Sequence, residues 1–132
     1  MRRWMTIGEL AEAAGVGVET VRYYQRKGLI ATPPAPAGRQ RRYAHSVLEE
    51  IAFIKRAQGY GFTLDEIGAI RRSAGRCGDA RVFAQGKLDE LSRQVEEIMG
   101  VARRLEDVLK KCEANSPSSP CPFIEALRGR AG

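Results

Sequence analysis

The sequence of 132 residues predicts a mainly α-helical protein: a small N-terminal helical domain, a long helix that pairs with a second copy of itself, and a short tail. Three observations predict this fold class. Thr-x-x-Glu capping boxes open short helices in the first half. A proline-rich segment interrupts these helices. Apolar residues then recur at alternating steps of four and three from Ala84 to Leu109, the pattern of a helix that packs along another helix.

The first thirty residues predict two short helices joined by a tight turn. Thr6 and Glu9 form a capping box that opens the first helix, and the turn is Gly-Val-Gly at residues 15–17. The second helix is expected over about residues 18–27, with Gly28 ending it. Such a pair is a candidate helix-turn-helix, although any small helical hairpin shows the same pattern.

The middle of the chain predicts a wing and two further helices. Residues 31–38 contain three prolines and cannot be helical, and the basic residues 39–43 that follow predict a small β-hairpin or wing. Ser46 and Glu49 predict a capping box for the third helix, with His45 at its start. Thr63 and Glu66 cap the fourth helix, and residues 73–76 form a linker.

The long helix is expected over about residues 78–111 and carries a stripe of apolar residues that we call the seam. Its members are Ala84, Leu88, Leu91, Val95, Ile98, Ala102, Leu105 and Leu109. The strict four-three spacing predicts a coiled coil between two copies. We expect the pair to be antiparallel, because that orientation would bring the cysteines at the two ends of the helix together. Because so many residues serve the seam, the monomer has little core of its own, and we expect a homodimer.

Three cysteines follow the same register. Cys77 and Cys112 are thirty-five residues, or five heptads, apart, so both lie in phase with the seam at its two ends. A helix holds them roughly 50 Å apart, and they cannot meet within one chain. An antiparallel partner brings Cys77 of one chain beside Cys112 of the other, and Cys121 folds back to the same place. The sequence therefore predicts two three-thiol sites per dimer.

The thiols are open to three interpretations. They are small buried hydrophobes, or redox-sensing thiols with Cys112 and Cys121 able to bridge, or metal ligands. Zinc prefers four ligands, and the only histidine, His45, lies far away in the sequence. Three thiolates suit a soft thiophilic ion. Arg76 and the helix N-terminus beside Cys77 favour its thiolate form.

The net charge of +6 is unevenly placed, with +5 in the first 60 residues and +1 in the rest. Residues 1–60 hold ten Lys and Arg against five Asp and Glu, whereas residues 61–132 hold twelve against eleven. An anionic polymer is therefore expected to dock on the first half. The basic and aromatic residues suited to a major groove and its flanking phosphates are Arg22, Tyr23, Arg26 and Lys27, with Arg39, Arg41 and Arg42 in the wing. A solvated basic face is the alternative, and Tyr24 is expected to be half-buried.

The chain is expected to be cytoplasmic and to have no membrane partner. It contains no run of about twenty apolar residues. Two arginines near the N-terminus are not followed by an apolar signal segment. Cytoplasmic thiols stay reduced, which argues against disulfides. The sequence contains no acid–base pair, phosphate-binding glycine loop or nucleophile–base arrangement, so we do not expect an enzyme.

Several motifs together resemble the MerR family of transcription regulators. They are TIGELA at residues 6–11, AGV at 14–16, ETVRYYQRKGL at 19–29, RRY at 41–43 and GFTLDEI at 61–67. The resemblance covers nearly the whole chain. It implies a winged helix-turn-helix DNA-binding domain over residues 1–74, a linker and dimerisation helix over 75–112, and a metal-binding loop with a short helix over 113–132. It also adds Thr20 and Tyr43 to the expected DNA-binding residues.

Within this family the cysteines, with CPFI at residues 121–124, resemble the mercury-sensing branch. The resemblance implies that the homodimer binds double-stranded promoter DNA and represses without metal. Hg(II) bound by Cys77 of one chain and Cys112 and Cys121 of the other then distorts the DNA and activates RNA polymerase at mercury-resistance genes. Related sensors of lead, cadmium or zinc, or of oxidants, are the alternatives. A thiol metal buffer that binds nucleic acid nonspecifically is an alternative of another class.

Overall fold

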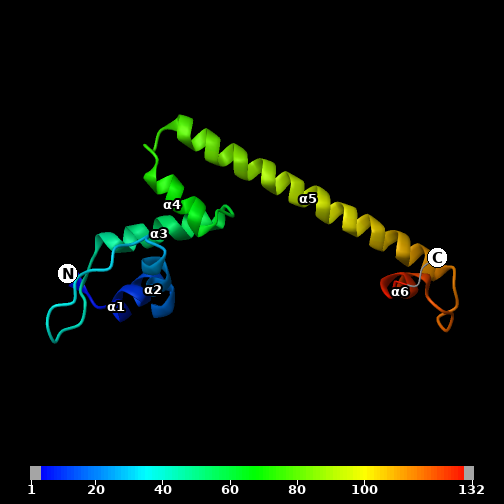
Figure 1. Ribbon diagram of the computed structural model, residues 1–132, viewed down its shortest axis with the longest axis horizontal. Helices are drawn as coiled ribbons and strands as arrows, with labels where there is room; N and C mark the ends of the chain where they lie inside the picture. The colour runs from blue at the N-terminus through cyan, green and yellow to red at the C-terminus, as the bar shows by residue number, and fades with distance from the viewer. Residues whose placement is uncertain (1–3, 130–132) are drawn as a thin grey trace. The chain divides into compact units, whose positions relative to one another are not determined.

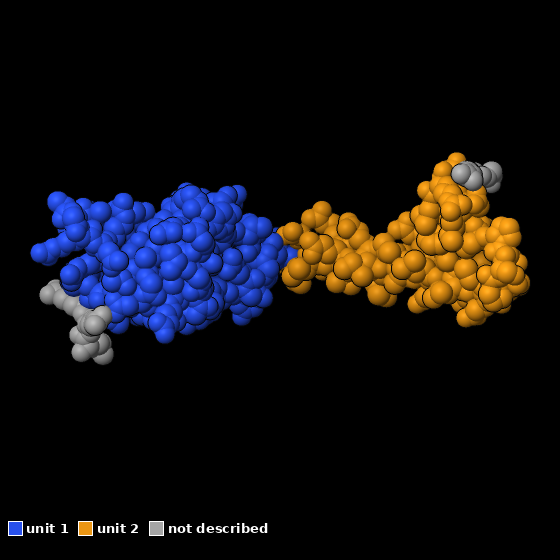
Figure 2. Space-filling model, turned by 90° about the horizontal axis from the view of Figure 1, so that it is seen from below, with its two compact units in different colours: residues 1–87 blue, residues 88–132 orange. Residues whose placement is uncertain are grey.

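The computed structural model describes residues 4–129 (Figure 1). The outermost residues of the predicted first and last segments, 1–3 and 130–132, lie outside the described residues. The chain divides into two compact units, Met1–Lys87 and Leu88–Gly132, which are coloured separately in Figure 2. The boundaries expected at residues 74 and 112 remain a prediction.

The fold is mainly helical, as the sequence predicts. The elements in order are β1 (Trp4–Met5), α1 (Ile7–Ala14), α2 (Val18–Arg26), β2 (Tyr43–Ala44), α3 (Ser46–Gly59), α4 (Leu64–Arg72), α5 (Cys77–Glu113) and α6 (Pro122–Leu127). No helix within residues 4–129 is long and apolar enough to cross a membrane.

Two of the three predicted capping boxes are present. The Thr6 hydroxyl accepts a hydrogen bond from the Glu9 N–H at 3.2 Å, and the Thr6 N–H donates to the Glu9 carboxylate at 3.1 Å. Thr63 and Glu66 make the same pair of bonds at the start of α4. The expected box at Ser46 is wrong. Helical backbone angles already begin at His45, so Ser46 lies inside the first turn and the helix has no side-chain cap.

The turn between α1 and α2 depends on a left-handed residue. Gly15 has φ of 70°, and its N–H donates to the carbonyl oxygens of Ala11 and Glu12, which closes α1. Gly17 is the N-cap of α2, and Gly28, with φ of 72°, follows the end of that helix. Both φ values lie in the region that glycine adopts without steric cost. The helix-turn-helix prediction is therefore confirmed at the level of local structure.

The wing differs in detail from the expected hairpin. Strand β2 starts only at Tyr43 and pairs antiparallel with β1, with Met5 opposite Tyr43 and Trp4 opposite Ala44. Residues 39–42 are irregular. The prolines upstream lack N–H donors for a ladder, so the N-terminal strand supplies the pairing instead. The wing is a loop closed at its base by a two-stranded ribbon.

A single apolar core holds unit 1 together. Its buried members are Met5, Leu10, Ala11, Val21, Tyr24, Leu29, Ile30, Tyr43, Ile51, Ile54 and Ile67. They come from both strands, from α1 to α4 and from the segment after α2. Burial at this density fixes the angle between α1 and α2, and so determines which face of α2 remains in solvent.

Unit 2 contains the later part of α5, a loop and α6. The seam residues within it are all exposed in the single chain; for example, Ile98 is 67% exposed and Leu109 is 61% exposed. Cys121 is the N-cap of α6 and Pro122 occupies the first helical turn, as predicted. None of the residues of α6 is buried. The apolar surface along α5 has the extent expected of a helix that pairs with another chain.

Candidate nucleic-acid interface and thiol site

Helix α2 has one buried face and one basic face. Val21 and Tyr24 are buried in the core, whereas Arg22, Tyr23 and Arg26 are exposed. Tyr24 was expected to be half-buried and is only 4% exposed, with its hydroxyl 3.3 Å from the amide oxygen of Gln58. The structure thus separates the two neighbouring tyrosines, and Tyr23 alone faces solvent among the basic side chains.

The basic face of α2 is ordered by local contacts. The Arg22 guanidinium donates to the Glu19 carboxylate at 2.8 Å. The Arg26 guanidinium and the Lys27 ammonium lie 5.6 and 5.8 Å from the centre of the Tyr23 ring, within cation–π range. These contacts hold the positive charges around one exposed ring, an arrangement that suits the edge of a DNA groove.

The residues predicted to contact DNA at the two ends of α2 have different surroundings. Thr20 is half-buried, near the N-terminus of α2. Lys27, just after the last residue of the helix, lies 4.0 Å from the Asp65 carboxylate on α4. This exposed pair is worth little by itself. It shows that the C-terminal end of α2 faces the first turn of α4.

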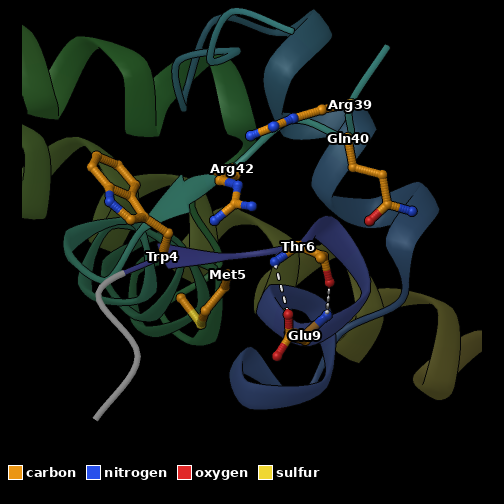
Figure 3. A pocket seen from close by; sticks show the side chains of 7 residues that line it. All are labelled: Trp4, Met5, Thr6, Glu9, Arg39, Gln40 and Arg42. Carbon is orange, nitrogen blue, oxygen red and sulfur yellow. Dashed lines mark hydrogen bonds between the residues drawn. The ribbon is translucent and has the colours of Figure 1, made fainter. Parts of the chain in front are cut away.

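The wing arginines remain exposed beside the N-terminal strand. Arg41 donates to the Pro33 carbonyl at 2.7 Å, which ties the wing to the proline-rich segment. A pocket of about 600 Å³ lies at the base of the wing (Figure 3). It is lined by Trp4, Met5, Thr6, Glu9, Arg39, Gln40 and Arg42. Its basic side chains lie beside the exposed indole of Trp4, a residue that the sequence patterns did not single out.

Tyr43 occupies a different place from the other predicted contacts. It is buried, with 2% of its surface exposed, and its hydroxyl accepts a hydrogen bond from the Gln25 amide at 2.7 Å. Tyr43 therefore links β2 to α2 and sets the wing relative to the basic helix. Gln25 has this role without any signal in the local sequence, because its partner lies eighteen residues away.

Two of the three cysteines come together within one chain. The thiols of Cys112 and Cys121 lie close enough for each to shift the pKa of the other. Backbone N–H groups of Ile124 and Phe123, together with the Cys112 thiol, hold the pKa of Cys121 below its ordinary value despite partial desolvation. Desolvation, reinforced by the neighbouring Cys121 thiol, raises the pKa of Cys112. The helix N-terminus thus favours the thiolate at Cys121.

Cys77 begins α5 and is exposed, in unit 1. The backbone N–H of Arg76, the residue before the helix, donates to the carboxylate of Asp79 in the first turn at 3.4 Å. Within residues 4–129 of the single chain, no three His, Cys, Asp or Glu side chains are arranged to hold a metal ion. Two neighbouring thiols such as Cys112 and Cys121 can supply two sulfur donors to a soft ion.

Comparison with known proteins identifies the family. A model described as MerR HTH family regulatory protein matches residues 5–74, and one described as MerR, DNA binding matches residues 48–108. The chain belongs to the MerR family. The helix-turn-helix, wing and long helix are the parts of the fold that these two models span. The prediction of a DNA-binding transcription regulator is therefore confirmed, and this family is not one of enzymes.

Curated relatives cover almost the whole chain. The mercuric resistance operon regulatory protein of Shigella flexneri is 38% identical over 130 residues, covering 97% of this chain and 90% of the relative. The protein of the same name from Bacillus cereus is 38% identical over 125 residues, covering 92% and 95%. Among solved structures, the transcription regulator PbrR691 from Ralstonia metallidurans CH34 in complex with lead(II) has a TM-score of 0.79 at 30% identity, covering 93% of this chain and 98% of that one.

Proposed function

We propose that this chain is a cytoplasmic, metal-responsive regulator that binds promoter DNA as a homodimer and has no catalytic role. It represses without metal and activates mercury-resistance genes when Hg(II) binds three thiolates. The observation that carries the proposal is the proximity of the Cys112 and Cys121 thiols, combined with Cys77 at the first residue of α5, the helix that also carries Cys112.

The donor set supports a soft ion held between two chains. Cys112 and Cys121 supply two thiols from one subunit, and Cys77 of the partner subunit supplies the third, because five heptads separate it from Cys112 in phase with the seam. Three sulfur donors favour thiophilic ions over magnesium or calcium. Relatives named for mercuric resistance and a lead-bound neighbour support a metal effector. We propose Hg(II), with Pb(II), Cd(II), Zn(II) or oxidants as the alternatives that the experiment separates.

Homodimer formation is supported by the exposed seam. A single α5 leaves Leu88, Val95 and Ile98 more than half exposed. Such a continuous apolar stripe is stable in water when it packs against a second helix. Antiparallel pairing is the arrangement that brings the two ends of the seam, and with them the thiols, together.

The DNA contacts follow from the exposed basic groups. We propose that α2 enters the major groove with Arg22, Tyr23 and Arg26, with Thr20 and Lys27 at its two ends. Arg39, Arg41 and Arg42 of the wing contact flanking phosphates, which fix register more than they read sequence. Tyr43, being buried, contributes through its hydroxyl or by positioning the wing. The functional segments proposed are residues 1–74, 75–112 and 113–132.

The switch follows from differential binding. Metal that binds one arrangement of the dimer more tightly shifts the population toward it, and the DNA-binding parts shift with it. Distorting a promoter costs on the order of 1–6 kcal/mol, a range that such binding can supply. The distorted promoter then presents both of its recognition elements to RNA polymerase without release of the regulator.

The test is a metal titration combined with a footprint. The reduced dimer is titrated with Hg(II), Pb(II), Cd(II) and Zn(II) against excess small thiol, with sulfur-to-metal absorption as the signal. A footprint upstream of its own gene is recorded with and without each ion. Hg(II) that outcompetes thiol at one or two ions per dimer and alters a sequence-specific footprint supports the proposal. Metal binding without a specific footprint indicates a thiol buffer and refutes it.

A further inference from the structure

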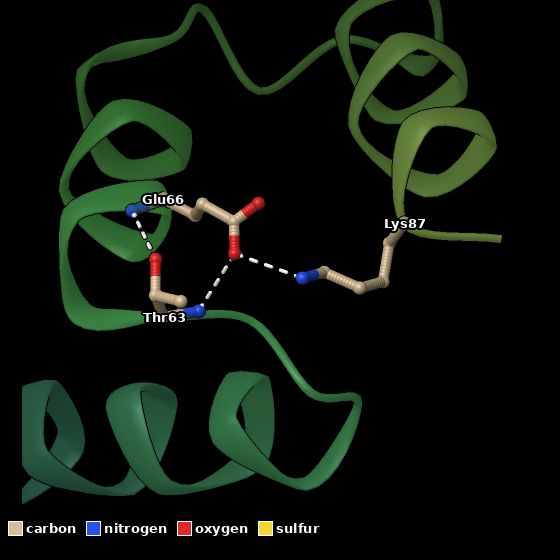
Figure 4. Close-up of polar contacts among 3 residues, drawn as sticks. All are labelled: Thr63, Glu66 and Lys87. Atoms are coloured by element: carbon tan, nitrogen blue, oxygen red, sulfur yellow. Dashed lines mark hydrogen bonds and ion pairs between the residues drawn. The ribbon is translucent and has the colours of Figure 1, made fainter. Parts of the chain in front are cut away.

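Lys87 is an unusual residue on α5. It is the one buried residue that the structure describes on this helix, with 6% of its surface exposed. Its ammonium lies 2.9 Å from a carboxylate oxygen of Glu66 on α4 (Figure 4). The ammonium also lies 5.4 Å from the centre of the Phe62 ring, within cation–π range. A lysine is rarely buried to this extent unless it is specifically paired.

The acceptor of this ion pair is held in place by the backbone. One oxygen of Glu66 accepts both from the Thr63 N–H at 2.8 Å and from Lys87 at 2.9 Å. The Glu66 N–H in turn donates to the Thr63 hydroxyl at 3.2 Å. The capping box therefore holds the carboxylate in place independently of Lys87, and the bonds from Thr63 and Lys87 keep the pKa of Glu66 below its ordinary value. Lys87 is anchored to the rigid first turn of α4.

The first turn of α4 also faces the basic helix. The carboxylate of Asp65, which precedes Glu66 in the sequence, lies 4.0 Å from the ammonium of Lys27 at the end of α2. A continuous set of contacts thus runs within unit 1 from α5 through the start of α4 to the end of α2. Lys87 lies ten residues after Cys77, roughly 15 Å along the same helix.

We propose that Lys87 is a positioning residue that couples the Cys77 end of α5 to the DNA-binding helices. The inference rests on the proposed function, since it concerns how a change at Cys77 reaches α2. A buried ammonium cannot leave its carboxylate without losing its compensating partner, so the pair holds α5 at one rotation and one axial position against α4. Any displacement of the start of α5 therefore moves α4 with it.

The variants that test this role remove charge and keep shape. Lys87→Met preserves the length and apolar stem of the side chain. Glu66→Gln keeps an amide oxygen for the capping box, which accepts Gln at this position, and removes the charge. Lys87→Arg retains the charge and serves as the rescuing variant. Arg103→Met removes an exposed charge elsewhere on α5 and serves as the matched control.

The full-length dimer is assayed on a promoter fragment labelled at both ends. Energy transfer between the labels reports DNA distortion with and without Hg(II), and band shifts and thiol competition report DNA and metal affinity. In Lys87→Met and Glu66→Gln we expect the ratio of metal-activated to basal transcription in vitro to fall at least about fivefold, the lower end of typical allosteric coupling. Affinities for metal and for DNA without metal stay near wild type, whereas the melting temperature falls, most of all in Glu66→Gln, which leaves the buried ammonium of Lys87 without its carboxylate. The double variant is no worse than either single variant, because both remove the same pair.

A wild-type ratio in both Lys87→Met and Glu66→Gln overturns the inference. A loss of metal-free DNA binding in these two variants, in parallel with the loss of activation, also overturns the inference. Lys87 would then be a structural or DNA-contacting residue. We expect Arg103→Met and Lys87→Arg both to keep the metal-activated transcription of the wild type. Failure of either variant also counts against a positioning role for Lys87. If the wild-type dimer itself shows no metal response, the proposed function fails and the inference falls with it.

Discussion

Truncation of one seam residue measures whether α5 pairs two chains. Replacing Ile98 by alanine removes three carbons, worth about 2.4 kcal/mol when fully buried. Ile98 is 67% exposed in the single chain, so a partner can bury at most that share, or about 1.6 kcal/mol per subunit. A dimer contains two copies, and the free energy of dissociation falls by about 3 kcal/mol. We expect the dissociation constant to rise roughly 200-fold.

Sedimentation equilibrium of the reduced protein over a concentration series measures this constant. The matched control is Val82→Ala, since Val82 lies on α5, is 71% exposed and is out of phase with the seam. Circular dichroism at high concentration verifies that both variants keep their helix. A dissociation constant for Ile98→Ala within threefold of the Val82→Ala value would refute pairing of two chains through the seam. Truncation of a seam residue would then have the same effect as truncation of a residue that faces solvent.

Three further predictions concern the thiols, the long helix and the start of α4. Cys77→Ala should abolish the metal response in the footprint and leave metal-free DNA binding intact; loss of both would make Cys77 a structural residue. Gly100→Ala should stabilise α5 by up to about 1 kcal/mol in thermal melts, because an added Cβ meets no atom within 4 Å and the position lies midway between two seam residues. A destabilised variant would mean that another chain approaches that face. The pKa of Glu66 is depressed, so its contribution to stability is present above its ordinary pKa of 4.5 and is lost as the pH falls through the folded-state value. Urea midpoints at about pH 6 and about pH 3 should therefore differ more in wild type than in Glu66→Gln, and equal differences would contradict this assignment.

The parts of the fold that the sequence predicts are those decided by neighbouring residues. The capping boxes at Thr6 and Thr63 need only a glutamate three positions on, and both form. Pro122 and Cys121 start α6 as expected, for the same local reason. The box at Ser46 does not form because the backbone is already helical at His45, the residue directly after strand β2. Ser46 therefore lies one position too late to cap the helix.

Long-range pairing explains the site residues that the patterns did not find. Tyr43 was grouped with the wing arginines, yet the register that places it opposite Met5 turns its ring into the core. Gln25 and Lys87 look like ordinary polar helix residues, and each acquires its role from a partner eighteen or more residues away. A periodic pattern specifies which face of a helix is apolar. It carries no information about which polar residue another helix will cover.

The thiol site makes a last prediction that links metal binding to assembly. Each chain brings Cys112 and Cys121 close together, so two of the three proposed donors are in place before any partner binds. If Cys77 of the partner subunit completes it, metal binds the dimer more tightly than the monomer, and linkage requires metal to tighten the dimer by the same factor. Ile98→Ala should then bind Hg(II) more weakly at low protein concentration and recover as the concentration rises, measured by competition with a small thiol. Hg(II) affinity that is independent of protein concentration in this variant would show that two thiols suffice, and that Cys77 does not contribute a sulfur from across the dimer.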